Sequence, residues 1–373
     1  MKGKASVLWK ATKADSFVDN SCLSMETVSI TEPVGEEVVV EVKAASLCHT
    51  DVSIAHGHID EQYPLVMGHE GAGIVRAVGD AVESVEPGDH VVLGRPACGR
   101  CTHCREANRH LCERRRESTP AGTLRTGEVR FDIDGDPVHH CHGVSSFAEY
   151  TLVTEEVAIP ITDEVPFEKA TLLGCGIFTG VGAVLQTAQV EFGSSVAIFG
   201  AGGVGLSAVQ GARLANATDI VVVDLVAEKL DTARDLGATE TVDASETDPV
   251  EYLQEEFGGV DYAFDVVGHP TVVEQAIAAL RPTGTAVLVG TPPAGIHELG
   301  IELHDFILDE KQVLGSFNGS FDLQEAIPKL AALVAAGDLV VDDLISSVRP
   351  LDALPEAMDE LENGDGIRHV LVP

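Results

Sequence analysis

One glycine-rich turn restricts the fold of this chain more than any other feature. The apolar run Val196–Phe199 leads into Gly-Ala-Gly-Gly-Val-Gly at residues 200–205, and a helical pattern follows over Leu206–Ala215. In such a strand–turn–helix context, Gly200 allows a tight turn, Gly202 lets the backbone approach a pyrophosphate, and Gly205 packs the helix on the strand. The sequence therefore predicts a dinucleotide-binding unit at this turn.

An acidic residue ends the next expected strand and indicates which dinucleotide binds. Asp224 follows Val221–Val223, about 20 residues beyond the glycines, where a carboxylate accepts hydrogen bonds from the adenosine ribose hydroxyls. The same carboxylate would repel a 2′-phosphate, so the sequence favours NAD over NADP. Lys229, in the following helical segment, is a further candidate for contact with this ribose, although a single surface lysine is an equal alternative.

The periodicity of the chain indicates two domains, the number that 373 residues suggest. Strands expected at 195–199, 220–224, 262–267 and 285–290 alternate with helical patterns, which predicts an α/β, doubly wound Rossmann domain over residues 178–315. Short strands with glycines, expected at 36–45, within 68–92 and at 147–153, predict a β-rich domain over residues 1–177. Residues 316–373 are expected to return to that domain. The polar stretch 113–146 is expected to form a long loop or a small lobe.

Four of the eight cysteines predict a metal site. They are spaced as Cys98-x2-Cys101-x2-Cys104-x7-Cys112, and the turn-forming spacers between them allow four thiolates to surround one tetrahedral Zn²⁺. Since sulfur would fill every coordination position, this zinc is expected to be structural, in a lobe at about residues 95–113.

The charge of the chain excludes several classes of protein. It has 60 Asp and Glu against 24 Lys and Arg, a formal net charge of −36, whereas nucleic acids and anionic lipids require a basic face. With no signal-peptide pattern and no apolar run of about 18 residues, we expect a cytoplasmic protein. The excess of carboxylates also suggests a halophilic source, because molar salt shortens the Debye length to about 3 Å.

Three further segments contain chemically reactive side chains: Cys48-His49-Thr50-Asp51, Gly68-His69-Glu70 and Gly174-Cys175-Gly176. Together, Cys48, His69 and Cys175 would form a set of two thiolates and one imidazole with an open fourth position, the catalytic zinc set known from alcohol dehydrogenase. Their wide separation in the chain makes this a weak inference from spacing alone.

With these segments, the chain resembles the zinc-dependent medium-chain alcohol dehydrogenases over nearly its whole length. The resemblance rests on the three segments above, the continuation to Gly73, the four-cysteine lobe, the glycine turn and Gly366-Ile367-Arg368. It implies that the β-rich domain is GroES-like and that the protein binds two Zn²⁺ ions, one catalytic and one structural, as well as NAD. It also implies a homodimer or homotetramer.

The resemblance further implies roles at matching positions. Cys48, His69 and Cys175 would be the catalytic zinc ligands, with Glu70 beside the metal and Asp51 orienting His69. Thr50 would receive the substrate proton. His49 and Arg368 would contact the cofactor pyrophosphate, while Thr179 and Val204 would line the nicotinamide, with ordinary packing as the alternative for those two.

Two departures from the family bear on the proton path and on the substrate. Many members carry a histidine five residues after the first cysteine ligand, but this chain has Ser53, so the path would end in water or use His56 or His58. The stretch 113–146 resembles the glutathione- or mycothiol-dependent formaldehyde dehydrogenase (class III) branch. There, Arg116 has the spacing of an arginine that binds a carboxylate of the thiol adduct, and Asp60 or Glu61 would meet its ammonium group.

The expected function is therefore hydride transfer between NAD and a zinc-bound primary or aryl alcohol. The alternative substrate is the S-hydroxymethyl adduct of formaldehyde with a thiol. A non-enzymatic NAD-binding sensor is less favoured, because no zinc ligand is missing. A zinc-bearing nucleic-acid module is disfavoured by the net charge. The basic segment from Arg95 to Arg130, which holds nine of the 15 arginines, either balances the zinc–thiolate charge, pairs with an acidic subunit, or holds an anionic substrate end.

Overall fold

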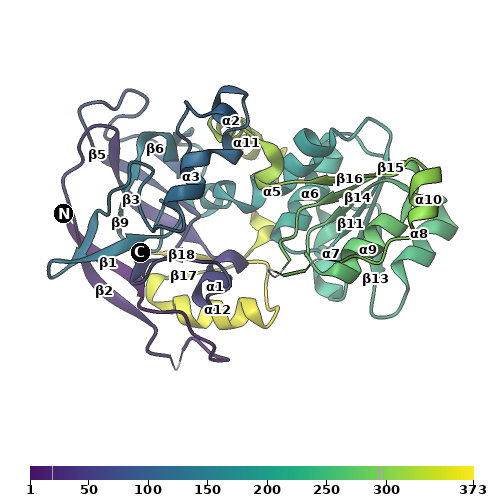
Figure 1. Ribbon diagram of the computed structural model, residues 1–373, viewed down its shortest axis with the longest axis horizontal. Helices are drawn as coiled ribbons and strands as arrows, with labels where there is room; N and C mark the ends of the chain where they lie inside the picture. Colours follow the sequence, from purple (N-terminus) through teal and green to yellow (C-terminus); the bar gives the residue numbers. More distant parts are fainter. Residues whose placement is uncertain (19, 293–294, 297) are drawn as a thin grey trace. The chain divides into compact units, whose positions relative to one another are not determined.

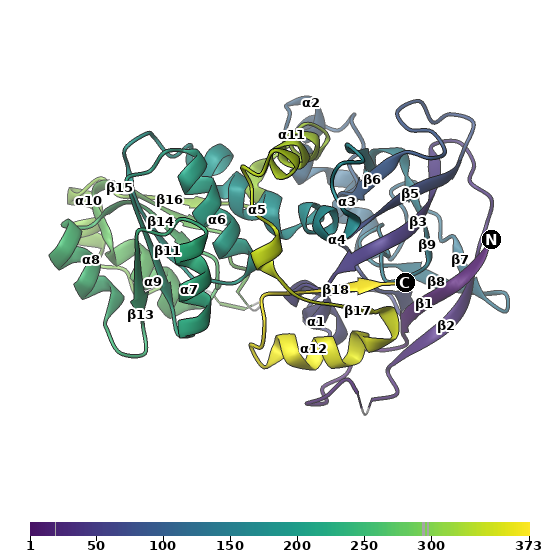
Figure 2. The same ribbon diagram turned by 180° about the vertical axis from the view of Figure 1, so that it is seen from behind.

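The computed structural model describes residues 1–18, 20–292, 295–296 and 298–373. It separates into two compact units, the first made of Met1–Cys175 and Asp322–Pro373 and the second of Gly176–Phe321. The expected domain boundaries, after residues 177 and 315, fall close to these junctions. In Figure 2 the C-terminal segment, in yellow, lies beside the purple and blue N-terminal strands of the first unit.

The first unit contains a closed barrel and a mixed sheet. The barrel order is β1 (Lys2–Leu8), β2 (Leu23–Ile30), β7 (Phe131–Ile133), β8 (Asp136–His140) and β4 (Leu65–Val66). The sheet order is β10 (Ala158–Pro160), β6 (His90–Leu93), β5 (Gly71–Val78), β3 (Glu37–Ser46), β18 (Arg368–Val372) and β17 (Ile345–Pro350), with β9 (Tyr150–Thr154) paired to β3. Its helices include α1 (His49–Ala55), α2 (Thr102–Arg105), α3 (Glu113–Ser118), α4 (Phe167–Ala170), α11 (Leu323–Ala336) and α12 (Leu354–Glu362).

Strand β3 confirms the strand expected at 36–45, and its apolar run is buried on both sides. Val38 and Val40 belong to one hydrophobic cluster, together with Val75 of β5. Val39 points into the cluster that fills the barrel, together with Val28. This burial on both faces explains why the strand lacks apolar–polar alternation at its start.

The structure corrects the expectation of a long loop or a small lobe across 113–146. Residues 113–118 form α3, and a β-hairpin of β7 and β8 completes the barrel, with Phe131 buried in the barrel cluster. The hairpin turn is Asp134-Gly135, both with positive φ (55° and 95°), between the paired residues Ile133 and Asp136. Asp-Gly is the sequence that two-residue hairpin turns favour, so the pattern that predicts this hairpin is present in the sequence.

The second unit is a parallel six-stranded sheet with connecting helices, the Rossmann-type α/β fold predicted from the sequence (Figure 1). The strand order is β13 (Glu240–Asp243), β12 (Asp219–Asp224), β11 (Ser195–Phe199), β14 (Val260–Asp265), β15 (Leu280–Leu288) and β16 (Gln312–Gly315). The helices are α5 (Gly176–Gly182), α6 (Gly203–Leu214), α7 (Ala227–Asp235), α8 (Pro249–Phe257), α9 (Pro270–Ala278) and α10 (Leu303–Leu308), with a π-helical segment at Ala183–Ala188. The four expected strands correspond to β11, β12, β14 and β15.

Within the described residues, no single helix has the length and apolar character needed to cross a membrane; one bent pair, Phe167–Gly174 with Gly176–Ala188, meets these criteria only when taken together.

Candidate metal and cofactor sites

The expected catalytic ligands come from three places in the first unit. Cys48 lies between β3 and α1, His69 and Glu70 lie between β4 and β5, and Cys175 follows the 3-10 turn Thr171–Gly174. Gly68 makes the turn before His69 possible: its φ is +93°, and an added Cβ would lie 2.5 Å from Ser146 Oγ. Only glycine fits there without displacing its neighbours.

The structure brings the four side chains together. The ligand atoms of Cys48, His69, Glu70 and Cys175 all lie within 4.8 Å of one another, and all four residues are buried. Among the described residues, His69 Nε2 and both Glu70 oxygens have no hydrogen-bond partner. Buried polar atoms without a partner are costly, and a divalent cation would satisfy them. Two sulfurs and an imidazole nitrogen are the donors that Zn²⁺ prefers, so the residues fit the metal.

Asp51 fixes the orientation of His69. Its Oδ1 lies 2.8 Å from His69 Nδ1, and its Oδ2 accepts a hydrogen bond of 3.1 Å from the Cys48 backbone. With its Nδ1–H donated to the carboxylate, a neutral His69 directs the Nε2 lone pair toward Cys48, Glu70 and Cys175. The position expected for Asp51 from the resemblance is therefore the one it occupies.

The electrostatics of the cluster favour a cation. The hydrogen bond from the Cys175 thiol holds the pKa of Cys48 well below its usual value, with a further contribution from Arg368. Burial raises the pKa of Glu70 to about 7. Arg368, only 3% exposed, donates to the Leu47 carbonyl at 3.3 Å, so its guanidinium lies next to the cluster rather than in solvent.

The four-cysteine lobe forms a second candidate metal site. The sulfurs of Cys98, Cys101, Cys104 and Cys112 lie within 4.8 Å of one another. Backbone N–H groups also point at the sulfurs: Cys98 N donates to Cys112 Sγ at 3.2 Å and Cys101 N to Cys98 Sγ at 3.3 Å. N–H donors stabilise thiolates, so the lobe fits a closed tetrahedral zinc site.

The glycine turn between β11 and α6 meets different requirements at its three glycines. Gly200 has φ +107°, and a Cβ on Gly205 would lie 1.8 Å from the Gly200 carbonyl oxygen, so protein packing requires both. A Cβ on Gly202 would meet no atom within 4 Å. At the end of β12, Asp224 Oδ2 accepts a hydrogen bond of 2.6 Å from Ala201 N and Oδ1 one of 2.9 Å from Val226 N, which holds the carboxylate beside the turn.

This difference predicts that Gly202→Ala weakens dinucleotide binding without weakening the fold. The new methyl group occupies the open space into which a pyrophosphate would approach. We expect the Kd for NADH, measured by fluorescence titration, to rise at least about tenfold, which corresponds to about 1.4 kcal/mol, with an unchanged melting temperature. Gly205→Ala is the contrasting variant and should lower the melting temperature. Unchanged NADH affinity in Gly202→Ala would contradict a pyrophosphate site at this turn.

The other expected cofactor residues of the second unit lie on helices that follow or flank this turn. Thr179 is on α5 and Val204 is on α6, and both are half-buried. The two helices touch closely, since a Cβ on Gly180 would lie 2.2 Å from the Val204 carbonyl oxygen. Lys229 is half-buried on α7, the helix after Asp224.

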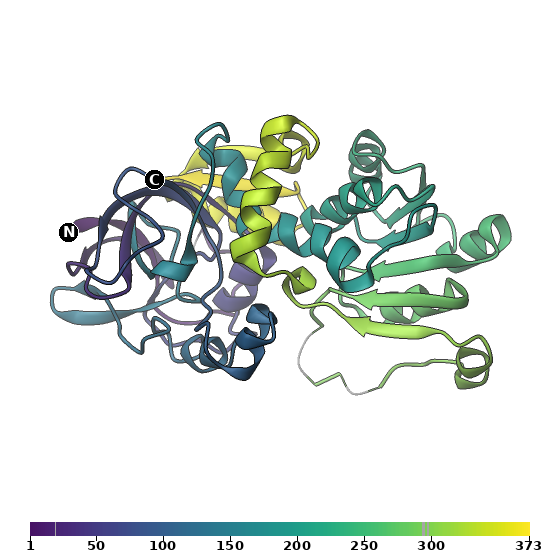
Figure 3. The same ribbon diagram turned by 90° about the horizontal axis from the view of Figure 1, so that it is seen from above.

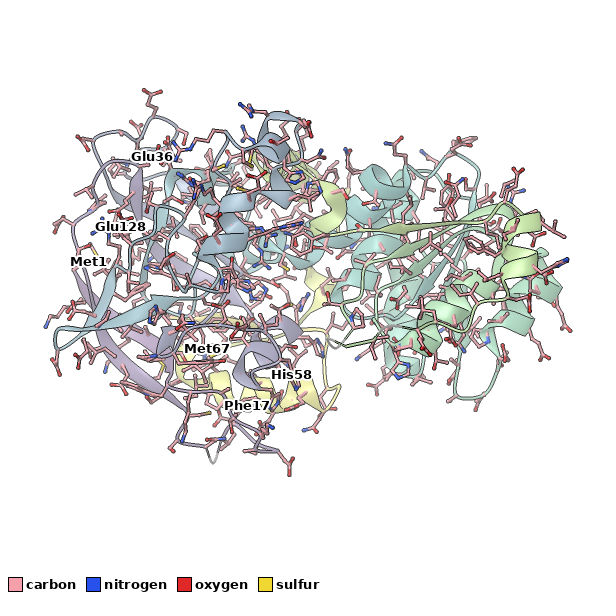
Figure 4. The ribbon with its side chains drawn as sticks, in the orientation of Figure 1. Met1, Phe17, Glu36, His58, Met67 and Glu128 are labelled. Atoms are coloured by element: carbon pink, nitrogen blue, oxygen red, sulfur yellow. The ribbon has the colours of Figure 1, made fainter. Side chains whose placement is uncertain are left out.

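The remaining first-unit residues named from the resemblance differ in their burial and in their partners. His56 is hydrogen-bonded to Glu362 Oε1 at 2.8 Å and to the Thr12 carbonyl at 3.1 Å, and its ring packs between Phe17 and His58, both labelled in Figure 4. His56 is thus engaged by structural partners. Of the other residues named from the resemblance, four have exposed side chains: His49, His58, Asp60 and Arg116. Thr50 and Ser53 are half-buried.

The sequence assigned no individual role to two polar side chains beside the metal cluster: Arg95, which it placed only in the basic segment, and His142. Arg95 donates to Cys175 Sγ at 3.9 Å and also contacts His142 Nδ1. The His142 ring lies 5.6 Å from the ring of His69, and its Nε2 lies 3.1 Å from Glu61 Oε1. Burial raises the pKa of Glu61 to about 8. Arg95 and His142 belong to no recognisable motif, so the sequence offers no pattern that would have identified them.

Comparison with known proteins agrees with this arrangement. Residues 35–163 match the alcohol dehydrogenase GroES-like domain and residues 203–336 match the zinc-binding dehydrogenase domain. An alcohol dehydrogenase zinc-binding domain protein from Burkholderia ambifaria is 37% identical, with a TM-score of 0.94, and 100% of this chain and 99% of that chain are covered. Benzyl alcohol dehydrogenase from Acinetobacter calcoaceticus is 32% identical, with a TM-score of 0.93 and the same coverage.

A zinc-binding dehydrogenase from Sinorhizobium meliloti, solved with NADP, is 31% identical, with a TM-score of 0.82 and both chains fully covered. The likeness to these relatives extends over the whole chain and includes both domains. With its buried Cys–His–Glu–Cys cluster, its four-cysteine lobe and its Rossmann unit, the chain belongs to the zinc-dependent medium-chain alcohol dehydrogenase family.

Proposed function

We propose that this protein is an NAD-linked alcohol dehydrogenase that transfers hydride between a primary or aryl alcohol and the nicotinamide. The observation that carries the proposal is the buried cluster of Cys48, His69, Glu70 and Cys175, whose donor atoms suit a catalytic Zn²⁺. Bound there, the metal would supply a Lewis acid that stabilises negative charge on the substrate oxygen. The name of the Acinetobacter relative supports an aryl alcohol as substrate.

The residues around the cluster provide orientation and a proton route. Asp51 holds His69 in one tautomer, and the burial of all four ligand side chains keeps bulk water away from them. Thr50, half-buried in the first turn of α1, is the hydroxyl we assign to receive the substrate proton and pass it to solvent. His56 is unsuited to the next step because both of its ring nitrogens have structural partners.

Asp224 supports NAD rather than NADP as the cofactor. Its two oxygens are fixed by backbone N–H groups at the end of β12, so the carboxylate cannot easily turn away from a ribose bound beside the turn. A 2′-phosphate at that position would meet a like charge, which costs several kcal/mol. We expect kcat/KM to be roughly 100-fold higher with NAD than with NADP.

A substrate panel tests the proposal against the thiol-dependent alternative. Reduction of NAD is followed with benzyl alcohol, with short primary alcohols, and with formaldehyde in the presence and absence of glutathione or mycothiol. We expect turnover with benzyl alcohol and no stimulation by thiols, because Arg116, the residue proposed to bind the adduct, is an exposed side chain on α3. Activity that requires a thiol would replace this proposal with formaldehyde oxidation.

We further propose that the protein forms a homodimer or homotetramer, with the second unit in the contact between copies. Strand β16 is an edge of the six-stranded sheet, whose strands are seen from above in Figure 3. Helix α10, which precedes β16 in the chain, has no buried residue. The segment 296–317, which includes both elements, has seven exposed apolar side chains among its described residues: Ile296, Leu299, Leu303, Ile307, Leu308, Val313 and Phe317. A second copy, paired edge to edge, would cover this face and the free strand edge. Light scattering should then give a mass above the 39.2 kDa of one chain.

The acidity of the chain supports a halophilic origin. A formal net charge of −36 repels itself at low ionic strength and is screened in molar salt. The panel is therefore run in both dilute buffer and molar salt, with higher activity expected in salt.

A further inference from the structure

Arg95 links the metal cluster to a second group of buried polar side chains. Arg95 is the second residue after β6, which ends at Leu93, and its guanidinium donates from Nη2 to Cys175 Sγ at 3.9 Å. Nη1 contacts His142 Nδ1, and Nε is buried without a hydrogen-bond partner. Within the described residues, Arg95 forms no ion pair with a carboxylate, whereas Arg125 and Arg130 of the same segment pair with Glu156 and Glu37.

The donor chemistry fixes the protonation of His142. A guanidinium only donates hydrogen bonds, so the Nδ1 atom that faces Arg95 must carry its lone pair. The proton of the neutral imidazole is then on Nε2, which lies 3.1 Å from Glu61 Oε1. Glu61 is 4% exposed and His142 is 9% exposed, so little solvent can compete with these contacts.

We propose that Arg95 is a positioning residue of the metal centre, which holds the sulfur of Cys175 by an N–H···S hydrogen bond while its contact with His142 holds Arg95. Cys175 is the ligand residue most distant from the others along the chain. It follows a short 3-10 turn rather than a strand. A charge-assisted donor fixes the thiolate and reduces the electron density it gives to the metal. The inference depends on metal binding at this cluster, and not on the identity of the alcohol.

The test measures the metal rather than catalysis. Arg95→Met keeps an unbranched side chain, shorter than that of arginine, and removes all donors. Release of zinc to a chelating dye, followed without NAD or alcohol, should become 10–100-fold faster for one of the two metals, the range expected for loss of such a supporting contact. In cobalt-substituted protein, the thiolate-to-cobalt absorption band should shift. Arg95→Lys, which retains one donor, should fall between the wild type and Arg95→Met.

Arg109→Met is the matched control. Arg109 lies in the same basic segment, is partly exposed, and pairs with Asp322 at 3.4 Å, so this variant loses the same charge without touching the cluster. Its metal release and cobalt spectrum should equal those of the wild type. His142→Phe removes the acceptor but keeps Arg95, and it should change both readouts in the same direction as Arg95→Met, by less.

The outcomes separate this proposal from its alternatives. Unchanged metal release and an unchanged cobalt band in both Arg95→Met and His142→Phe would overturn it. An increase in KM confined to anionic substrates, with unaltered metal properties, would also overturn it, because Arg95 would then bind substrate. If Arg95→Met does not fold, as judged by circular dichroism and by loss of the four-cysteine metal, then Arg95→Lys and His142→Phe decide. If the wild type holds two metals but oxidises no alcohol, the proposed function is wrong, and the role of Arg95 at the metal centre can still be tested by metal release.

Discussion

Cys175→Ala is expected to abolish alcohol oxidation while dinucleotide binding persists. Cys175 supplies one of two sulfurs in the buried cluster, and its loss leaves His69 Nε2 and the Glu70 carboxylate with too few partners to hold the metal. Metal-ion catalysis contributes several kcal/mol of charge stabilisation, and each 1.36 kcal/mol is a factor of ten. We therefore expect kcat/KM to fall by at least about 10³-fold. Metal content should fall by one ion per chain, with an unchanged Kd for NADH.

The control for Cys175→Ala is Cys22→Ala. Cys22 is also a fully buried thiol of the first unit, but it belongs to a hydrophobic cluster and to neither group of metal ligands. This variant should keep both metals and nearly full activity. Retained turnover in a Cys175→Ala protein that contains one metal per chain would contradict the assignment of the catalytic centre.

Cys104→Ala is expected to affect stability more than any other single substitution in the four-cysteine lobe. Cys104 is the buried residue of α2, a helix of only four residues, and short helices of this length do not persist without tertiary support. Structural zinc contributes folding free energy directly. A loss of about 3 kcal/mol from the free energy of unfolding would lower the melting temperature by roughly 6–12 °C.

Calorimetry and metal analysis measure this effect. Cys104→Ala should lose one metal per chain and its cooperative transition should move down, while the remaining metal stays at the Cys48 cluster. Chelator treatment of the wild type should lower the transition in the same direction, whereas Cys22→Ala should not. A Cys104→Ala protein with a full metal complement and a wild-type melting temperature would show that the lobe holds no structural metal.

Local patterns in the sequence predicted four of the six strands of the sheet in the second unit. The expected strand at 195–199 is β11, and the expected strand at 220–224 is β12 with one more residue at its start. These strands are buried apolar runs that end at glycine or aspartate, so their ends are marked by residue type. The turn is also marked by residue type, because the φ of Gly200 and the close contact at Gly205 admit only glycine.

The cluster of Cys48, His69, Glu70 and Cys175 could not be assembled from spacing. Cys48, His69 and Cys175 come from three different parts of the first unit, and only pairing of β3, β5 and their neighbours brings them together. The resemblance to a family supplied what local periodicity lacks. The contacts of Arg95 and His142 could not be predicted from spacing either, and no motif marks these residues, because their contacts are tertiary.

Helix phase explains a further difference at the basic segment. Counting four residues from Cys112 singles out Arg116, but residues 113–118 form α3, and neighbouring residues on a helix point in directions about 100° apart. Arg116 faces solvent, whereas the Nε of Arg115 is buried, where desolvation and then the charge of Arg95 lower the pKa of Arg115 to about 10. Spacing alone cannot distinguish the two arginines without the start of the helix.

The most direct test of the account is a metal-dependent measurement of NADH formation. The protein is purified in molar salt, stripped of the metal at the Cys48 cluster, and mixed with NAD and benzyl alcohol while absorbance at 340 nm is recorded before and after zinc is added. We expect no change in absorbance before zinc is added and steady NADH formation afterwards, saturating at one added Zn²⁺ per chain. Equal rates of NADH formation with and without metal, or no oxidation of any alcohol by the zinc-loaded protein, would contradict it.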